Sequence, residues 1–229
     1  MIEVENVRKR YRRRWVLDGL SFRAEKGRIT CLIGLNGAGK STALKAMMGL
    51  TPYQEGSIRL EGMALDKRSY ERISFVPDHL PMPSAMKLGE GLQFMADFYA
   101  SWNASRAREL MHFFDLNEGE RVGNLSKGTA AKYNLVLGLA PDTDYVLMDE
   151  PLSGIDVFSR ETVASVFSSE WLEGRGVLLT THEIAEMEHL IDHAVLLKGG
   201  RTVRSFDCER VRDEEGKSVL DLMREVLLA

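Results

Sequence analysis

The residues with the clearest chemistry lie in the stretch GLNGAGKST, residues 34–42, which follows an apolar run and precedes a segment without Gly or Pro, residues 43–48. Their spacing fits G-x-x-x-x-G-K-[ST], a loop whose backbone N–H groups face a phosphate at the start of a helix. In such a loop Lys40 contacts the β- and γ-phosphates, and the Ser41 hydroxyl ligates Mg²⁺. A plain Gly-rich turn is the alternative. The predicted nucleotide-binding residues are Gly34, Leu35, Asn36, Gly37, Ala38, Gly39, Lys40, Ser41 and Thr42.

Two acids and a histidine follow later apolar strands. The segment YVLMDEP puts Asp149 and Glu150 at the end of one strand, and LLTTHE puts His182 at the end of another. Because the carboxyl ends of parallel strands meet at one edge of a sheet, we expect these side chains beside the phosphate loop. We interpret Asp149 as a Mg²⁺ ligand, Glu150 as the base that activates water and His182 as a phosphate-facing catalytic residue. Two solvated acids at an ordinary strand end are the alternative.

These side chains need a sheet whose strands end together. Apolar, β-rich runs typical of buried parallel strands occur, with helical segments between them, at residues 29–33, 73–76, 145–148, 177–181 and 194–197. Alternating patterns at residues 2–7, 16–22 and 57–60, with a turn predicted at 54–56, indicate an antiparallel layer. Residues 83–141 change to helical periodicity. The sequence therefore predicts an α/β fold with a mainly parallel core, an N-terminal antiparallel β layer and a helical insert.

Composition places the chain among globular proteins. It has 229 residues, of which 44% are hydrophobic, and a formal net charge of −4 at pH 7. The only cysteines, Cys31 and Cys208, do not suggest a disulfide framework and favour a reducing, cytosolic compartment. We identify no secretory signal, and no window approaches the ~20 apolar residues that span a bilayer. If the protein serves a membrane, we expect another chain to supply the membrane-spanning part.

A local basic run departs from this acidic balance. The stretch RKRYRRR, residues 8–14, holds six basic residues around Tyr11. A charge run of this kind is usually a solvated face, and contact with nucleic acid or anionic lipid is the alternative. Because the net charge argues against a general nucleic-acid coat, no nucleic-acid partner is expected.

Six features follow one another along nearly the whole chain: an aromatic residue before the first hairpin, then GLNGAGKST, LSKGT, VLMDEP, SGID and TTHE. This order resembles the nucleotide-binding subunit of an ABC transporter. The resemblance implies a P-loop NTPase (RecA-like) fold in a single ABC ATPase domain, residues 1–229. Within it we expect a nucleotide-binding core at 1–78 and 144–229, and a helical subdomain with the signature motif at 79–143. The LSKG form and the FYASW stretch resemble bacterial exporter-type and antibiotic-resistance-type subunits with a separately encoded membrane partner.

The resemblance also implies a site shared between two chains. Tyr11 would stack on adenine, although an aromatic anchor in a hairpin is the alternative. Ser126 and Gly128 of the signature motif would contact the γ-phosphate of ATP held by the opposite subunit, and Asp156 would lie at the dimer seam. The aromatic residues of the helical insert are expected to form its core, or in part to line a groove for a short helix of the membrane subunit.

Two positions depart from the family pattern. Asp78 replaces the usual glutamine after the strand ISFVP, and Thr129 replaces the common glutamine at the end of the signature. Aspartate is a hard oxygen donor that can still ligate Mg²⁺, but it adds negative charge near Asp149 and Glu150. A solvated loop acid is the alternative for Asp78. Thr129 keeps a hydroxyl with less reach, which affects the expected contact with the opposite subunit.

The predicted function is therefore an ATPase subunit that uses ATP and Mg²⁺ and works with a second ATPase subunit, as a homodimer or heterodimer. It is expected to drive a separately encoded transmembrane permease, for export, from the cytoplasmic face of the membrane. A soluble ABC ATPase that acts on ribosomes or DNA or as a regulator is the alternative. A module that binds ATP without hydrolysis is disfavoured because Lys40, Asp149, Glu150 and His182 are all present.

Overall fold

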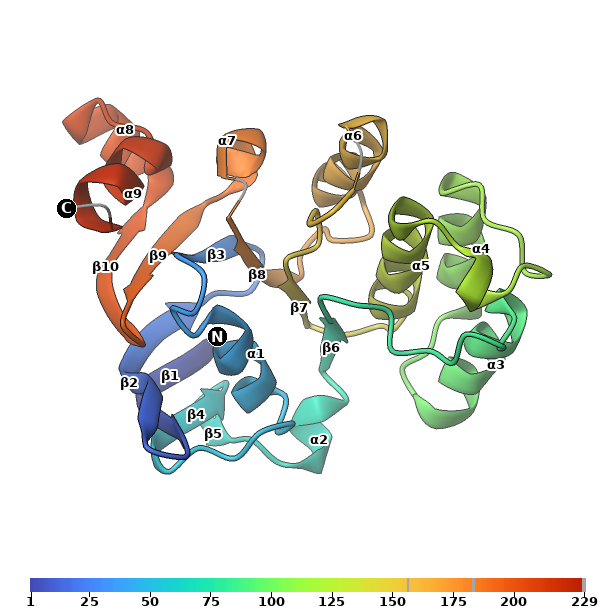
Figure 1. Ribbon diagram of the computed structural model, residues 1–229, viewed down its shortest axis with the longest axis horizontal. Helices are drawn as coiled ribbons and strands as arrows, with labels where there is room; N and C mark the ends of the chain where they lie inside the picture. Colours follow the sequence, from blue (N-terminus) through green and yellow to red (C-terminus); the bar gives the residue numbers. More distant parts are fainter. Residues whose placement is uncertain (156, 183, 228–229) are drawn as a thin grey trace.

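The computed structural model describes residues 1–155, 157–182 and 184–227 (Figure 1). Its central sheet consists of β3 (Ile29–Gly34), β6 (Ile73–Val76), β7 (Tyr145–Asp149), β8 (Gly176–Thr181), β9 (His193–Lys198) and β10 (Arg201–Asp207). The strand order is β10-β9-β3-β8-β7-β6, and all neighbours are parallel except β10 with β9. The five predicted parallel strands are thus confirmed, each to within one residue at either end.

The edge strand β10 was not predicted. It turns back from β9 through Gly199 and Gly200, which both have positive φ, and it pairs with β9 as a hairpin. Its sequence, RTVRSFD, contains two arginines and an aspartate, because much of an edge strand faces solvent. The apolar run that identifies a buried strand is therefore missing.

A second, antiparallel sheet has the order β2-β1-β4-β5. Its strands are β1 (Ile2–Tyr11), β2 (Arg14–Ala24), β4 (Glu55–Leu60) and β5 (Met63–Ala64). The predicted antiparallel layer is confirmed, but the turn predicted at 54–56 is wrong, since β4 already begins at Glu55. Gly56 has φ 90°, and a Cβ there would lie 2.4 Å from the Asn6 carbonyl oxygen. This glycine permits close strand pairing rather than a chain reversal.

The helix that follows the phosphate loop, α1 (Lys40–Met47), packs between the two sheets. Its buried Ala43, Leu44 and Met47 join a core made with apolar residues of both sheets. Short helices then cover the remaining surfaces of the core. They are α2 (Lys67–Tyr70), α6 (Val157–Ser165), η2 (Val166–Ser168), α7 (Ile184–Met187), η3 (Glu188–Leu190), α8 (Cys208–Glu215) and α9 (Val219–Leu227).

The predicted helical insert is confirmed and lies beside the β6 edge of the central sheet (Figure 1). Its helices are α3 (Leu88–Phe98), α4 (Ala104–Phe113), η1 (Val122–Asn124) and α5 (Lys127–Leu139). Buried Leu88, Leu110 and Tyr133 form its core, and the Tyr133 hydroxyl donates to the Leu88 carbonyl at 2.7 Å. Because this core is continuous with the apolar core that packs against the central sheet, the insert has a defined position relative to that sheet. No helix in the described part of the chain is long and apolar enough to cross a membrane.

Candidate nucleotide site

The loop between β3 and α1 has the geometry that its glycines predict. Gly37 and Gly39 have φ values of 81° and 104°, in the region that favours glycine. A Cβ on Gly39 would lie 2.7 Å from the Val16 carbonyl oxygen of the first hairpin. Any larger residue would push the loop away from that hairpin. The loop therefore leads into α1 with its backbone N–H groups at a helix start, a favourable position for an anion.

Lys40 is buried, with only 6% of its surface exposed, and its side chain folds back over the loop. Its ammonium donates to the Gly34 carbonyl at 2.8 Å and lies 3.3 Å from Glu150 Oε1. A buried lysine needs such partners, because an unpaired ammonium in the interior is costly. The structure thus brings the lysine of the loop and the proposed base of β7 into direct contact.

Asp149 lies at the end of β7 and is fully buried. Ser41 Oγ donates to its Oδ1 at 2.9 Å, and Thr180 Oγ1 donates to the same oxygen at 2.8 Å. Burial raises the pKa of Asp149, the hydrogen bonds from Thr180 and Ser41 lower it, and the negative charge of Asp78 adds to the increase. The other oxygen, Oδ2, is buried without a hydrogen-bond partner in the described structure. A buried carboxylate oxygen with a free lone pair beside a hydroxyl fits a hard cation such as Mg²⁺.

Glu150 follows directly and has φ 51°, an unusual value for a residue other than glycine. Its backbone N–H donates to Thr180 Oγ1 at 3.0 Å and to the Thr180 carbonyl at 3.1 Å, which hold the strained backbone in place. Its Oε2 lies 2.7 Å from His182 Nδ1 and accepts from the His182 backbone N–H at 3.2 Å. Strain of this kind is found at functional sites. Glu150 therefore stands between Lys40 and His182.

These groups surround a cavity of about 450 Å³. Its walls are formed by Val16, Asn36, Gly37, Ala38, Gly39, Lys40, Ser41, Thr42, Asp78, Glu150, Ser153 and His182. Ten of the predicted site residues therefore line one cavity, and Asp149 contacts this wall through its hydrogen bond from Ser41. Sequence reasoning missed Val16, Ser153 and the supporting Thr180. The Thr180 hydroxyl had a signal, because TT at the end of an apolar strand puts a polar side chain at a buried position.

Other predicted residues lie apart from this cavity. Leu35, at the outside of the loop, is 51% exposed. Tyr11 is exposed at the hairpin tip, where its hydroxyl lies 3.1 Å from Thr51 Oγ1 and the Lys9 ammonium lies 4.7 Å from its ring centre. Its role towards adenine stays a prediction.

The signature residues also lie apart. Ser126 caps α5, where its Oγ accepts from the Thr129 backbone N–H at 3.1 Å and lies 2.8 Å from Thr129 Oγ1. Gly128 is buried in the first turn of that helix. Neither Ser126 nor Gly128 is among the described residues that line the phosphate cavity. Asp156, predicted at a dimer seam, lies outside the described residues.

The substituted position Asp78 lies in the cavity wall, as a metal ligand would require. Its Oδ1 lies 2.8 Å from His79 Nδ1, and both side chains are exposed. The structure therefore brings Asp78 to the same cavity as Glu150, while its metal role stays a prediction.

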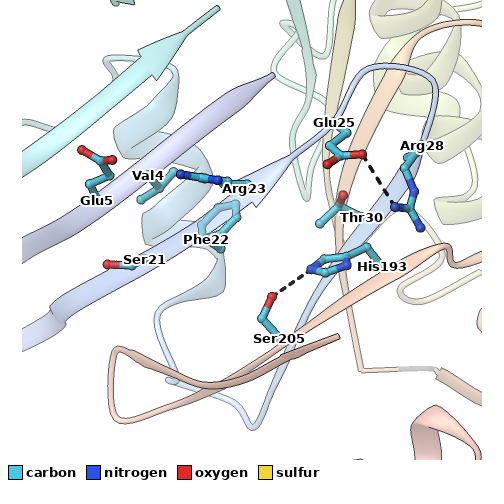
Figure 2. Close-up of a pocket in the computed structure, with 10 residues that line it drawn as sticks. All are labelled: Val4, Glu5, Ser21, Phe22, Arg23, Glu25, Arg28, Thr30, His193 and Ser205. Atoms are coloured by element: carbon cyan, nitrogen blue, oxygen red, sulfur yellow. Dashed lines mark hydrogen bonds and ion pairs between the residues drawn. The ribbon is translucent and has the colours of Figure 1, made fainter. Parts of the chain in front are cut away.

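A different cavity, of about 480 Å³, lies between the two sheets (Figure 2). Two pairs form among its charged and polar groups: Arg28 lies 3.6 Å from Glu25, and His193 Nε2 lies 2.8 Å from Ser205 Oγ. Burial lowers the pKa of His193, and the charge of Arg28 adds to this. Because the carboxylates of Glu5 and Glu25 line this cavity and Arg28 is already paired, it is a poorer site for a phosphate than the loop before α1.

The model of the ABC transporter family matches residues 17–153, which include the phosphate loop, the signature and the Asp149–Glu150 pair. The chain belongs to the ABC transporter family. It is an ATP-binding subunit of this family and an ATPase, as its sequence predicted. Solved structures with the same fold include a dimeric bacterial ABC transporter cassette, at 21% identity and a TM-score of 0.80, and a bacterial ABC exporter with ATP bound, at 20% identity and a TM-score of 0.81.

Relatives and solved structures agree with this assignment. The chain is 28% identical over 211 residues to the linearmycin resistance ATP-binding protein LnrL of Bacillus subtilis, covering 89% of this chain and 68% of the relative. It is 33% identical over 210 residues to the Nod factor export ATP-binding protein I of Burkholderia pseudomallei, covering 88% and 69%. An ATP-binding subunit of an ABC transporter superimposes with a TM-score of 0.87, at 26% identity over 98% of both chains.

A dimeric ABC cassette in a post-hydrolysis state, bound to ADP and Pi, has a TM-score of 0.80 at 21% identity, covering 90% of this chain and 98% of the other. This likeness confirms the predicted fold class.

Proposed function

We propose that the chain is the ATPase subunit of an exporter, that it hydrolyses ATP with Mg²⁺, and that a separately encoded permease is its membrane partner. Export is supported by the names of its relatives, which act in Nod factor export and linearmycin resistance. The subunit would lie on the cytoplasmic face of the membrane through that permease. Its division into a core at 1–78 and 144–229 and a helical subdomain at 79–143 is part of this proposal.

The contacts of Lys40, Glu150 and His182 support a mechanism for hydrolysis. Lys40 exchanges its ion pair with Glu150 for oxygens of the β- and γ-phosphates, which frees Glu150 Oε1 to accept a proton from the attacking water. Water attacks the γ-phosphorus, the bond to the β-phosphate oxygen breaks, and ADP and phosphate form. His182 holds Glu150 through Oε2 and faces the same cavity.

The residues of the metal site are Ser41 and Asp149, with Asp78 as a further oxygen donor in the cavity wall. The unpartnered Oδ2 of Asp149 is the observation that supports a cation here. When bound, Mg²⁺ neutralises phosphate charge.

The single observation that carries the dimeric part of the proposal is the separation of the signature from the phosphate cavity. The cavity wall contains residues of the loop and of three strand ends, but the described wall lacks Ser126 and Gly128. We infer that these two residues complete the site of a second subunit, so ATP holds two chains together and hydrolysis releases them.

An apolar groove of about 340 Å³ supports docking of a permease. It lies between the core and the helical insert and includes Met48, Leu50, Tyr70, Phe75, Pro81, Met82, Met95, Tyr99 and Pro141. Of the aromatic residues of the insert, Tyr99 belongs to this groove, whereas Phe114 is buried in the core. A short helix of the permease would fit such a groove.

The dimeric site is tested in the Glu150→Gln background, where slow turnover should preserve an ATP-bound dimer detectable by size-exclusion chromatography with light scattering. Adding Ser126→Asp should abolish that dimer and leave the ATP affinity of the monomer unchanged. Ser105→Asp, on the exposed face of α4, is the matched control and should leave the dimer intact. A loss of ATP affinity in monomeric Ser126→Asp would mean that the serine acts within its own subunit.

Docking is tested with two exposed apolar residues of similar accessibility, Leu50 at 65% and Met63 at 63%, of which only Leu50 belongs to the groove. Leu50→Asp should prevent recovery of the subunit with the cell membrane fraction, and Met63→Asp should not. Equal recovery of both variants would contradict the groove as the docking site.

A further inference from the structure

The tip of the β1–β2 hairpin carries exposed positive charge that the nucleotide site does not use. Arg10, Arg12, Arg13 and Arg14 are all exposed, and within the described residues none of them forms an ion pair. Arg8, farther from the tip, is neutralised by Asp18 at 2.9 Å and Glu55 at 3.1 Å. Four arginines without an ion pair among the described residues, within a stretch of five, are notable in a chain of net charge −4.

At the turn of this hairpin, an arginine occupies a backbone conformation that other residue types adopt more readily. Tyr11 pairs with Arg14, so Arg12 and Arg13 form a two-residue turn, and Arg12 has φ 54°. Asn or Gly is the common choice at such a position, because positive φ brings Cβ close to a carbonyl oxygen; glycine has no Cβ, and asparagine can form a local hydrogen bond. A residue held at a conformational cost suggests a role for its side chain. This observation is independent of the charge count.

The tip is also held firmly against the segment that follows α1. The Arg10 backbone N–H donates to Gln54 Oε1 at 2.8 Å, the Gln54 N–H donates to the Arg8 carbonyl at 2.8 Å, and the Tyr11 hydroxyl lies 3.1 Å from Thr51 Oγ1. These contacts fix the backbone that carries the arginines, so the hairpin itself need not be ordered when a ligand binds, which lowers the entropy cost of binding.

This surface adjoins the docking groove. Thr51, which contacts Tyr11, directly follows Leu50 of the groove wall. In Figure 1 the hairpin tip, the segment after α1 and helix α2 lie along the same lower edge of the molecule. A permease seated in the groove would therefore bring the arginines towards the membrane. Trp15, whose ring lies 4.2 Å from the Arg8 guanidinium and 5.2 Å from that of Arg10, adds an aromatic residue of the kind found at membrane interfaces.

We propose that Arg10, Arg12, Arg13 and Arg14 bind the phosphate groups of anionic lipids beside the permease. The inference rests on the proposed docking groove, because the groove orients the tip. Guanidinium groups bind phosphate oxygens in pairs of hydrogen bonds, and basic residues near an anionic leaflet each add to membrane affinity. A nucleic acid would fit less well, since its regularly spaced phosphates need an extended basic track and this surface spans a single turn.

The test measures cosedimentation of the purified full chain with vesicles of phosphatidylglycerol and phosphatidylcholine, against vesicles of phosphatidylcholine alone, at 50 mM and 500 mM NaCl. The chain should bind the anionic vesicles at low salt and be released at high salt. Arg12→Gln with Arg13→Gln should lower the partition coefficient about 25-fold, from about 5-fold for each arginine. The matched control, Arg108→Gln with Arg210→Gln, removes the same charge from exposed positions on α4 and α8.

Equal vesicle binding by the wild type and the hairpin variant, or an equal loss in the control, would overturn the proposal. Tighter, arginine-dependent binding to a single-stranded RNA homopolymer than to the vesicles would overturn it in favour of a nucleic-acid partner. ATP turnover is measured on the same samples without vesicles. Failure of turnover in the wild type would count against the ATPase mechanism, whereas failure of vesicle binding with normal turnover would count against lipid contact alone.

Discussion

The two ends of the central sheet each bury a charged side chain that has no ion pair among the described residues, but they treat it differently. At the carboxyl ends of the strands, Asp149 has two hydroxyl donors on one oxygen and none on the other. At the amino ends, Arg175, just before β8, donates to the Leu139, Pro141 and Trp171 carbonyls at 3.1, 3.2 and 3.3 Å. It also contacts the hydroxyls of Ser74 and Thr143.

The Arg175 partners come from separate elements, and two of them, Leu139 and Pro141, lie at the C-terminal end of α5. A cation there is favoured by the helix dipole. Burial lowers the pKa of Arg175 to about 10, so the guanidinium remains charged at neutral pH. Its charge is spread over neutral acceptors that hold α5 to the sheet.

The two ends of the central sheet therefore serve different tasks. At the amino end a buried charge has nearly all its hydrogen bonds filled by the protein, which stabilises the junction with the helical insert. At the carboxyl end the protein leaves an oxygen of Asp149 unfilled and Glu150 strained, which costs stability and suits ligand binding. Substitutions at the two ends should therefore affect different properties.

The largest expected effect is on catalysis. Glu150→Gln should slow ATP turnover by at least about 10²-fold, because amide nitrogen and oxygen cannot accept the water proton as a carboxylate does. ATP affinity should be retained, since Lys40 still contacts phosphate. Turnover is measured by phosphate release and affinity by equilibrium titration. Unchanged turnover would remove Glu150 from its role as base.

At the opposite end, Arg175→Met should lower the free energy of unfolding by about 2–3 kcal/mol, because buried carbonyls at the end of α5 lose their donor. Urea denaturation gives the change. ATP affinity of the monomer should remain normal, since the phosphate loop is distant in the fold. The control Arg210→Met removes an exposed arginine paired with Glu214 and should change stability by no more than about 0.5 kcal/mol. Equal effects of the two variants would mean that the buried network contributes little.

The sequence predicted the residues at the carboxyl ends of the strands better than those at the amino ends. The phosphate loop, Asp149, Glu150 and His182 stand at the ends of contiguous apolar runs, so their convergence follows from the parallel sheet. Arg175 gave no such signal, because its acceptors come from segments far apart in the chain. The edge strand β10 and the start of β4 were missed for a related reason. Their residues form strands because they pair with particular neighbours, and a local hydrophobic pattern does not reveal those neighbours. The roles of Tyr11, Ser126 and Asp78 remain predictions.

Asp149→Asn should separate stability from function at the catalytic end. In the presence of a chelator it should raise the free energy of unfolding by about 1–2 kcal/mol, because it removes a buried charge whose raised pKa indicates that ionisation is unfavourable there. The same variant should lose Mg²⁺-dependent ATP hydrolysis. Urea denaturation with and without chelator, with phosphate-release assays, gives both results. A destabilised Asp149→Asn protein would contradict the contrast with Arg175.

The smallest effect is expected at Asp78, which adds a negative charge to the wall of the phosphate cavity. With Mg²⁺ present this charge favours the cation, and without it the carboxylate repels the γ-phosphate. Asp78→Asn keeps an oxygen of similar reach and removes the charge. ATP is titrated into both proteins, with Mg²⁺ and with chelator, and the double difference in binding free energy should be about 1 kcal/mol, as expected for one partly screened charge pair. A double difference of zero would mean that Asp78 does not sense the metal–phosphate pair, and its contact with His79 would then be its main interaction.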